Sequence, residues 1–286
     1  MTAAGEDTGL QAWAGRSERA EDILTPHLLQ AYRATVLDEA EPDAARPAPP
    51  GIHWCLATAV APMSAVGPDG HPARGGFLPP VPLPRRMWAG SRIRFHDEFR
   101  AGDRVERVST VTAIAEKEGR TGRLCFVTVT HRFSTARGPA VEEEQDIVYR
   151  ALSPGAPDPR PVEPAPASDS PADAKRTVDG SAVLLFRYSA LTFNSHRIHY
   201  DRTYAVDEEG YEGLVVHGPL QASLLMALAA SMRPAEPLKR FDFRAQRPLF
   251  DGGPIVLKGA WQNERAAELW VGGDRALPHM SATAGW

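Results

Sequence analysis

The sequence predicts an α+β protein built from two similar halves, each made of one apolar helix and an antiparallel sheet. Three observations lead to this prediction. The chain has 286 residues, more than one small module requires. Residues 154–174, rich in proline, alanine, aspartate and serine, divide it near the middle. Runs of β-branched and aromatic residues separated by glycines recur in both halves.

The expected organisation has four parts. It comprises a flexible N-terminal tail, a first half, a Pro/Ala-rich linker and a second half, over residues 1–20, 21–153, 154–175 and 176–286. Each half is about as long as one ordinary domain. The sheets of two such halves can join edge to edge, which removes one exposed edge from each sheet.

In the first half, residues 53–61 are apolar and compatible with a helix. Residues 62–84 carry seven prolines and must be largely loop, and the loop is long enough to suggest a role in binding. Strands of an antiparallel meander are predicted at residues 105–115, 124–134 and 145–152.

In the second half, residues 183–188 are predicted as a strand, and a polar segment follows. An apolar helix is predicted at residues 220–232, and Pro234 ends it. Leu224, Leu225 and Leu228 share one face of this helix. Three further strands are predicted at residues 240–246, 255–261 and 268–271.

Composition excludes several classes of protein. Hydrophobic residues make up 43% and charged residues 24%, as in ordinary globular proteins. The net charge of −4 argues against nucleic-acid or membrane binding as the main role. Cys55 and Cys125 lack a CxxC partner, which argues against a disulfide framework and favours a reducing compartment. No basic start with an apolar run is present, so we expect a cytoplasmic protein.

The densest group of side chains capable of catalysis lies at residues 192–201, directly after the predicted strand. Asn194, His196, His199 and Asp201 fall within it. Residues 213–219 then lead into the apolar helix, so the amide of Gly218 lies at a helix N-terminus. Such an amide can stabilise an oxyanion.

These two motifs, FRYSALTFNSHRIHYD and GLVVHGPLQ, resemble the MaoC-like hot dog hydratases and dehydratases. The similarity is greatest to the double hot dog branch that includes mesaconyl-CoA hydratase and 3-hydroxyacyl-thioester dehydratase. The first half shows no counterpart of Asn194 and His199, so we expect it to be non-catalytic and to shape the acyl pocket. The segments RRMWAG and EEQDIVYR in the first half also match that branch. The resemblance implies a double hot dog fold in which each half wraps a central helix, the helices beginning near Gly51 and Pro219. It also implies an acyl-thioester substrate.

In the wider family the motif carries an aspartate and, five residues later, a histidine, which handle the water and the α-proton. Those positions correspond here to Asn194 and His199. An amide cannot transfer a proton near neutral pH, although it can hold a water, so His199 must do more of the proton work. His196 and Asp201 rank below this pair, because neighbours in an extended segment point in alternating directions. Asn194 alone could also be a turn residue.

Other candidates are expected to bind substrate. Arginine forks and aromatic faces suit the phosphates and adenine of coenzyme A, and the candidates are Arg85, Arg86, Trp88, Arg244 and Arg247. Arg197 is a candidate for a carboxylate on the acyl group, and His217 is expected to pack or hydrogen-bond at the helix entrance. Residues 142–144 are interpreted as a solvated strand entry.

The expected activity is reversible hydration of an enoyl-CoA, or dehydration of a 3-hydroxyacyl-CoA, with a short branched or dicarboxylic acyl group such as mesaconyl. The alternatives are a hot dog acyl-CoA thioesterase and a non-catalytic acyl-thioester-binding partner subunit. Neither a metal nor an organic cofactor is expected, coenzyme A being part of the substrate. No nucleic-acid or membrane partner is expected. One site per chain is predicted in a monomer or homodimer.

Overall fold

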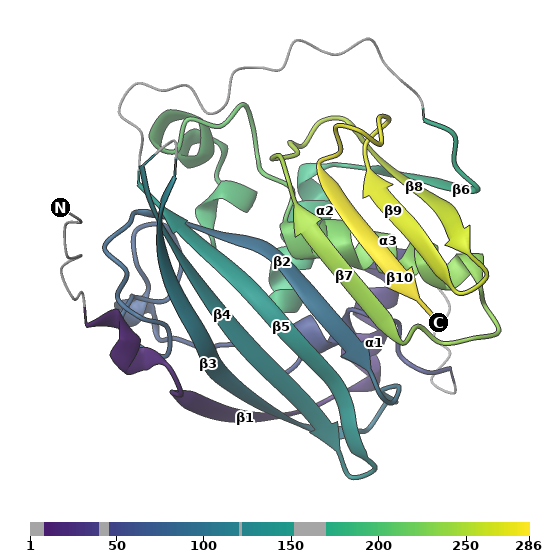
Figure 1. Cartoon of the computed structure of the whole chain (residues 1–286), viewed down its shortest axis with the longest axis horizontal. Coiled ribbons are helices and arrows are strands. Elements are labelled where there is room, and N and C mark those ends of the chain that lie inside the picture. The colour runs from purple at the N-terminus through teal and green to yellow at the C-terminus, as the bar shows by residue number, and fades with distance from the viewer. Residues whose placement is uncertain (1–8, 40–45, 120–121, 152–169) are drawn as a thin grey trace, which may run out of the picture.

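The computed structural model describes residues 9–39, 46–119, 122–151 and 170–286, which form one continuous antiparallel sheet of ten strands (Figure 1). The strands lie in the order β1-β3-β4-β5-β2-β7-β10-β9-β8-β6. Strands consecutive in the sequence pair in two runs, β3-β4-β5 and β8-β9-β10, as in meanders closed by short hairpins.

The first half contributes five strands and the second half the other five. The first five are β1 (Ser17–Ile23), β2 (Arg85–Phe95), β3 (Arg104–Gly119), β4 (Gly122–Thr135) and β5 (Gly138–Arg150). The other five are β6 (Ala174–Asp179), β7 (Arg240–Ala245), β8 (Pro254–Asn263), β9 (Ala266–Val271) and β10 (Met280–Gly285). The three strands predicted in the first half are present, as are three of the four predicted in the second half, whereas β1, β2, β6 and β10 were not predicted.

The two halves join through β2 and β7. These strands pair antiparallel, with Ser91 opposite Phe243 and Ile93 opposite Phe241. Gly90 lies at the bulge in β2, where a Cβ atom would come within 2.3 Å of the Phe243 carbonyl oxygen. The close approach of the two backbones therefore requires glycine at this position.

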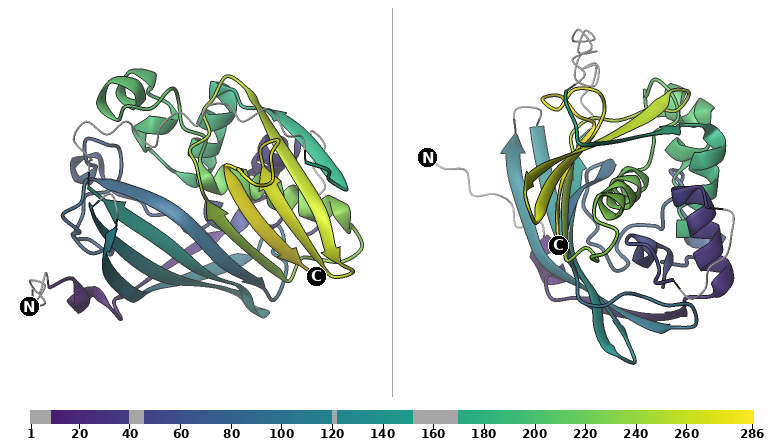
Figure 2. Two further views of the ribbon diagram at one scale, coloured as in Figure 1. Left: turned by 45° about the horizontal axis from the view of Figure 1, so that its top comes forward. Right: turned by 90° about the vertical axis from the view of Figure 1, so that its right-hand side faces the viewer.

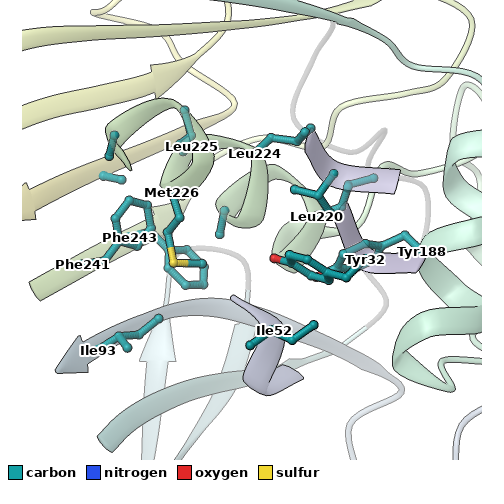
Figure 3. Close-up of a cluster of buried hydrophobic side chains, with 14 of the residues drawn as sticks. Tyr32, Ile52, Ile93, Tyr188, Leu220, Leu224, Leu225, Met226, Phe241 and Phe243 are labelled. Carbon is teal, nitrogen blue, oxygen red and sulfur yellow. The ribbon is translucent and has the colours of Figure 1, made fainter. Parts of the chain in front are cut away.

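Helix α3 (Gly218–Met232) lies on the concave side of the sheet, and α1 (Pro26–Tyr32) and α2 (Ala182–Thr192) lie beyond it (Figure 2). It confirms the helix predicted at residues 220–232. Its side chains are buried almost all round, so both the sheet and the outer helices cover it. Figure 3 shows Leu220, Leu224 and Met226 within this core, facing Tyr32 and Tyr188 from the outer helices and Ile93 and Phe241 from the sheet.

Within the part of the first half that the structure describes, the central helix that the resemblance implied is absent. Only a 3-10 turn, Ile52–Cys55, is present there. Gly51 precedes it with φ 93°, and the chain leaves helical geometry at Leu56. Ala57 then adopts φ 51°, a left-handed conformation that interrupts a helix. The expected helix at residues 53–61 is therefore wrong.

The outer layer consists of α1 (Pro26–Tyr32) and α2 (Ala182–Thr192), and a π-helical turn, Arg33–Leu37, continues α1. Helix α1 begins as its residues favour, because the Thr25 hydroxyl accepts a bond from the Leu28 amide and Pro26 occupies the first turn. The strand predicted at residues 183–188 is wrong, since this segment is part of α2. Leu184, Leu185 and Tyr188 are buried at helical spacing, but Val183 and Phe186 are exposed and hide that period in the sequence.

The predicted N-terminal tail and the predicted linker lie partly outside the described residues. The expected tail at residues 1–20 contains a 3-10 turn, Leu10–Trp13, and the beginning of β1, which pairs with β3. Residues 1–8 lie outside the described residues. The same holds for most of the expected linker, residues 152–169, while its end forms the first residues of β6. Among the described residues, no helix combines the length and apolar character needed to cross a membrane.

The 3-10 turn of the first half packs against a buried carboxylate, that of Glu143. The Glu143 carboxylate accepts a 2.9 Å bond from the Trp54 indole and lies 3.4 Å from His53 Nε2. Both His53 and Glu143 are 1% exposed, so the expectation that residues 142–144 are a solvated strand entry fails for Glu143. Strand β5 turns alternate side chains to the core, and this residue faces inward.

Candidate active site

The motif loop of the second half begins where α2 ends. Phe193 closes the helix in the left-handed conformation, with φ 49°, and the chain reverses toward α3. Residues 194–196 are followed by a 3-10 turn, Arg197–His199. Side chains three residues apart lie above one another in a 3-10 turn. His196 and His199 therefore share one side, and their ring centroids are 5.5 Å apart.

His199 is buried and held in one orientation. Its side chain is 7% exposed, and Nδ1 lies 2.7 Å from the Val215 carbonyl oxygen. A carbonyl only accepts, so Nδ1 carries the hydrogen and Nε2 keeps its lone pair. Burial lowers the pKa of His199 to about 4. The ring is thus neutral at pH 7 and presents Nε2 as a base.

His217 supports His199 from the other side. The two rings stack with centroids 3.6 Å apart and planes 20° apart. His217 Nε2 lies 2.8 Å from the Ser189 hydroxyl of α2, and the side chain is 1% exposed. Burial lowers its pKa well below the ordinary value. A neutral ring fixed in this way leaves His199 little freedom to rotate.

Gly218 follows His217 and begins α3, with Pro219 in the first turn. A Cβ atom at Gly218 would meet nothing within 4 Å, so the space beside this residue is open. No side chain caps this end of α3 among the described residues. A helix N-terminus directs unpaired amides and a partial positive charge outward. The open backbone beside the His217–His199 stack can therefore receive a negative oxygen.

Asn194 lies at the start of the same loop and acts partly as a turn residue. Its Oδ1 accepts a 3.0 Å bond from the His196 amide. Its backbone amide donates to the Ser189 carbonyl at 2.9 Å. The side-chain NH₂ group, which can only donate, remains to contact a substrate oxygen or a water.

A loop of the first half completes the surroundings of the motif. The Arg197 amide donates to the Asp69 carbonyl at 2.9 Å, and the Ser195 hydroxyl donates to the Gly70 carbonyl at 2.5 Å. Gly70 adopts φ 88°, and a Cβ atom there would come within 1.9 Å of the Ser195 carbonyl oxygen. Residues about 125 positions apart in the sequence are thereby held together.

The docked loop places His71 and Asp69 against His196. The rings of His71 and His196 lie with centroids 4.0 Å apart, and Asp69 Oδ2 lies 3.0 Å from His71 Nδ1. Nitrogen and oxygen atoms of all three side chains converge within 4.8 Å, as they do in some divalent-metal sites. Here the Asp69–His71 hydrogen bond explains the approach, and the guanidinium of Arg86 beside both rings would repel a cation. We therefore assign no metal ligands.

Comparison with known proteins places the chain in a family. Residues 51–251 match the family described as hydroxyacyl-thioester dehydratase type 2. The chain belongs to that family. It is 47% identical over 275 residues to the mesaconyl-C(4)-CoA hydratase of Chloroflexus aurantiacus, covering 95% of this chain and 96% of that protein. It is 26% identical over 231 residues to the mitochondrial hydroxyacyl-thioester dehydratase type 2 of Schizosaccharomyces pombe, covering 72% and 75%.

Solved structures agree on the fold of this dehydratase-family chain. A MaoC-like dehydratase superposes with a TM-score of 0.70 at 16% identity, covering 96% of this chain and 99% of that one. A Mycobacterium tuberculosis protein described as having a double hot dog fold superposes with a TM-score of 0.54 at 14% identity, covering 95% and 96%. The expected α+β double hot dog fold and the MaoC-like resemblance are confirmed.

In this family member, two of the arginines predicted to bind substrate contact other parts of the protein instead. Arg197 pairs with Asp201 at 2.7 Å and lies over the Tyr204 ring. Arg85 donates to the Glu209 carbonyl at 2.6 Å and lies over the ring of Tyr211. Both guanidinium groups are therefore engaged within the protein, which argues against their predicted roles.

The other predicted substrate-binding residues also differ in where their side chains lie. Burial lowers the pKa of both His71 and His196, and the nearby charge of Arg86 lowers both further. Trp88 donates to the Ser91 hydroxyl at 2.9 Å and packs edge-on against Trp54. Arg247 donates to the carbonyls of Leu277 and Pro278. Arg244 is exposed on the face of β7 opposite Phe243, away from the core.

Sequence reasoning missed Asp69 and His71. The proline-rich loop was predicted to have a binding role, but no spacing within the sequence connects it to the motif at residues 194–199. The dipeptide Asp69-Gly70 predicts only a turn. Their proximity to His196 depends on the three-dimensional docking of the loop.

Proposed function

We propose that this protein hydrates an enoyl-CoA whose short acyl group carries a second carboxylate, as mesaconyl does, and catalyses the reverse dehydration. The observation that carries the proposal is the fixed Nε2 lone pair of His199, beside the open helix N-terminus at Gly218. The family and the 47% identical hydratase support the same reaction class. The reaction is acid–base chemistry that these side chains can perform.

In the proposed hydration step, His199 Nε2 takes a proton from water as the oxygen bonds to the β-carbon. The π electrons of the double bond move toward the thioester, and negative charge develops on its oxygen. That oxygen would lie at the Gly218 amide, where the helix N-terminus stabilises it. Proton return to the α-carbon re-forms the thioester carbonyl. The side-chain NH₂ of Asn194 would help to hold the water.

Arg86 is the proposed partner of the second carboxylate. Arg197 was the predicted cation, but its pairing with Asp201 leaves it neutralised. Arg86 instead lies close enough to His71 and His196 for its charge to lower the pKa of both. A guanidinium can hold a carboxylate through two parallel hydrogen bonds.

The experiment that tests this function compares enoyl-CoA esters of equal length with and without a terminal carboxylate. We expect kcat/KM for the dicarboxylic ester to exceed that for the monocarboxylic ester about 100-fold, from the roughly 3 kcal/mol of a charge-assisted hydrogen bond. Arg86→Met should remove most of this preference. Equal rates for both esters would contradict the proposed acyl group, although not the hydratase activity.

Thioester hydrolysis is the alternative enzymatic function, since the same base could activate water for attack on the carbonyl. Free thiol release and loss of the enoyl absorbance, followed with one substrate, separate the two reactions. We expect the absorbance to fall without thiol release. A non-catalytic partner subunit would show neither change, and activity of the single purified chain would exclude it. We further propose that the protein acts in the cytoplasm, with coenzyme A as the thioester carrier.

A further inference from the structure

Hydration needs two proton-transfer events, and the motif loop supplies one suitable group. His199 can take the proton from water, but Asn194 cannot deliver a proton to the α-carbon. Asp201, which lies nearby in sequence, is paired with Arg197 at 2.7 Å. His196 lies beside His199, but burial, the largest cause, and neighbouring cationic groups lower its pKa to about 2. A ring that remains neutral at every working pH is a poor proton donor.

The first-half loop carries a better candidate. His71 has a carboxylate partner, because its amide donates to Asp69 Oδ1 and its Nδ1 lies 3.0 Å from Asp69 Oδ2. A carboxylate placed at Nδ1 orients an imidazole and stabilises its charged form. The side chains are only partly exposed, 21% for His71 and 31% for Asp69. Among the described residues, the hydrogen bond of the His71 ring is made by Nδ1, which leaves Nε2 to contact a substrate.

Hydrogen bonds hold the first-half loop against the motif loop of the second half. Its backbone accepts three bonds from the motif loop: at Pro68 from the Arg197 guanidinium, at Asp69 from the Arg197 amide and at Gly70 from Ser195. The fit at Gly70 excludes any side chain. His71, His196, His199 and His217 then follow as successive ring contacts with centroids 4.0, 5.5 and 3.6 Å apart.

We propose that Asp69 and His71 form the second acid–base pair of this active site, delivered to the second-half motif by the first-half loop. This inference rests on the proposed hydratase function. In the hydration direction, His199 Nε2 takes a proton from water while the C–O bond forms at the β-carbon. The protonated His71 gives its Nε2 proton to the α-carbon as the thioester carbonyl re-forms. The proton on His199 then passes to His71 through solvent between turnovers, so that the cycle consumes only water and enoyl thioester.

The charges around His71 set the pH range in which this works. Burial lowers its pKa, the hydrogen bond and charge of Asp69 act in the opposite direction, and Arg86 and Arg74 lower it further. Burial alone would raise the pKa of Asp69, but the bonds from His71 outweigh it and hold the pKa below its usual range. Asp69 is therefore ionised throughout. A bell-shaped profile of kcat/KM follows, with His199 setting the acid limb and His71 the basic limb.

The test uses Asp69→Asn and His71→Asn in the full chain. In Asp69→Asn the amide keeps the size of the side chain but loses its charge, so the pKa of His71 falls. We expect the basic limb to move to lower pH by about one unit and kcat at pH 7 to fall about tenfold. In His71→Asn the proton donor is absent. We expect a kcat loss of at least about 100-fold, with KM changed by less than about threefold and the His71-dependent limb absent.

The control is Asp97→Asn, which removes an ion-paired carboxylate beyond the opposite end of β2, where Arg137 holds it. It should leave both limbs in place. If Asp69→Asn lowers activity without moving the basic limb, Asp69 is only structural and the proposal is overturned. Histidine NMR of the same proteins reports the pKa of His71 directly, whatever the turnover. If the pKa of His71 is the same in Asp69→Asn as in the wild type, the pairing is overturned. If that pKa does shift but the wild-type protein hydrates no enoyl thioester, the proposed function is overturned instead.

Discussion

At the scale of single residues, one histidine side chain has its chemistry fixed by its neighbours. The Val215 carbonyl selects the tautomer of His199, and His217 fixes the plane of its ring. Burial keeps the ring neutral. The sequence predicted His199 from its motif position. The stack on His217 could not be predicted, because it depends on how the end of one loop meets the start of α3.

Replacing His199 by Asn tests this residue as the base. We expect kcat to fall about 1,000-fold, within the usual contribution of general acid–base catalysis. The smaller amide leaves part of a buried site empty, so we expect a modest loss of thermal stability without loss of the fold. The matched control is His27→Asn on the exposed surface of α1, which should keep full activity. Near-normal turnover of the His199 variant would contradict the assignment, and initial rates with one enoyl-CoA are sufficient to measure it.

The pH dependence at low pH follows from the same residue. The pKa of His199 lies below its ordinary value, at about 4, and the base must be neutral to accept a proton. On the acid limb, kcat/KM should therefore fall only near pH 4, while His71 sets the basic limb. An Asn194→Asp variant adds a negative charge nearby, which favours the protonated ring and should move this limb upward. An acid limb near pH 6.5 in the wild type, measured with short assays, would show that burial does not lower the pKa of His199.

At the scale of elements, the first-half loop joins the site to the rest of the molecule. Its prolines predicted a loop correctly, and its length suggested a binding role. Its docking at Ser195 and Arg197 was not predictable, since the contacts are mostly to backbone atoms and leave no side-chain pattern. The missing first-half helix has a similar cause. Residues 53–61 are apolar enough for a helix, but the left-handed geometry of Gly51 and Ala57 limits it to one turn.

Gly70→Ala tests whether docking of this loop matters. A methyl group there would lie 1.9 Å from the Ser195 carbonyl, so the loop must move away. We expect at least a tenfold loss of kcat and faster amide hydrogen exchange in residues 62–84 and 194–200. Gly75→Ala is the matched control. Gly75 has nearly the same backbone angle, φ 85° against 88°, but its nearest neighbour would be 3.7 Å away. Equal losses in both variants would assign the effect to backbone strain alone.

At the scale of the whole molecule, the two halves have different roles in one sheet. The second half keeps the central helix and the motif. The first half has only a 3-10 turn at the corresponding place, buries His53 against Glu143, and contributes the loop. Sequence patterns predicted six strands and the α3 helix, because their apolar periods are local. They failed at α2, where exposed apolar residues hide the helical period, and at Glu143, whose burial depends on the distant Trp54 and His53.

The Glu143 pair should matter for stability. Burial raises the pKa of Glu143, but the bonds and charge of His53 outweigh it and leave the pKa below its ordinary value. Such a carboxylate adds stability above its unfolded-state pKa, about 4.3, and that stability is lost as pH falls through the lower folded-state pKa. Glu143→Ala should therefore cost about 3 kcal/mol of unfolding free energy at pH 7. The neighbouring Glu144→Ala, half exposed and paired with Arg92, should cost less than about 1 kcal/mol. Urea denaturation measures both, and equal costs would contradict the burial argument.

The number of sites per molecule follows from the asymmetry of the halves. The fixed histidine and the open helix N-terminus are in the second half, and the corresponding first-half segment is the single turn Ile52–Cys55. We therefore expect titration with a non-reactive acyl-CoA analogue to saturate at one equivalent per chain. Two equivalents would mean that the first half also binds substrate.

The central claim is that one fixed histidine and one helix N-terminus hydrate an enoyl thioester. Its most direct test is to incubate the purified chain with mesaconyl-CoA in water enriched in ¹⁸O and to analyse the product by mass spectrometry. The account predicts a hydroxyacyl-CoA that retains its thioester and carries one ¹⁸O in the acyl chain. Free coenzyme A with ¹⁸O in the released carboxylate, or unchanged substrate, would contradict it.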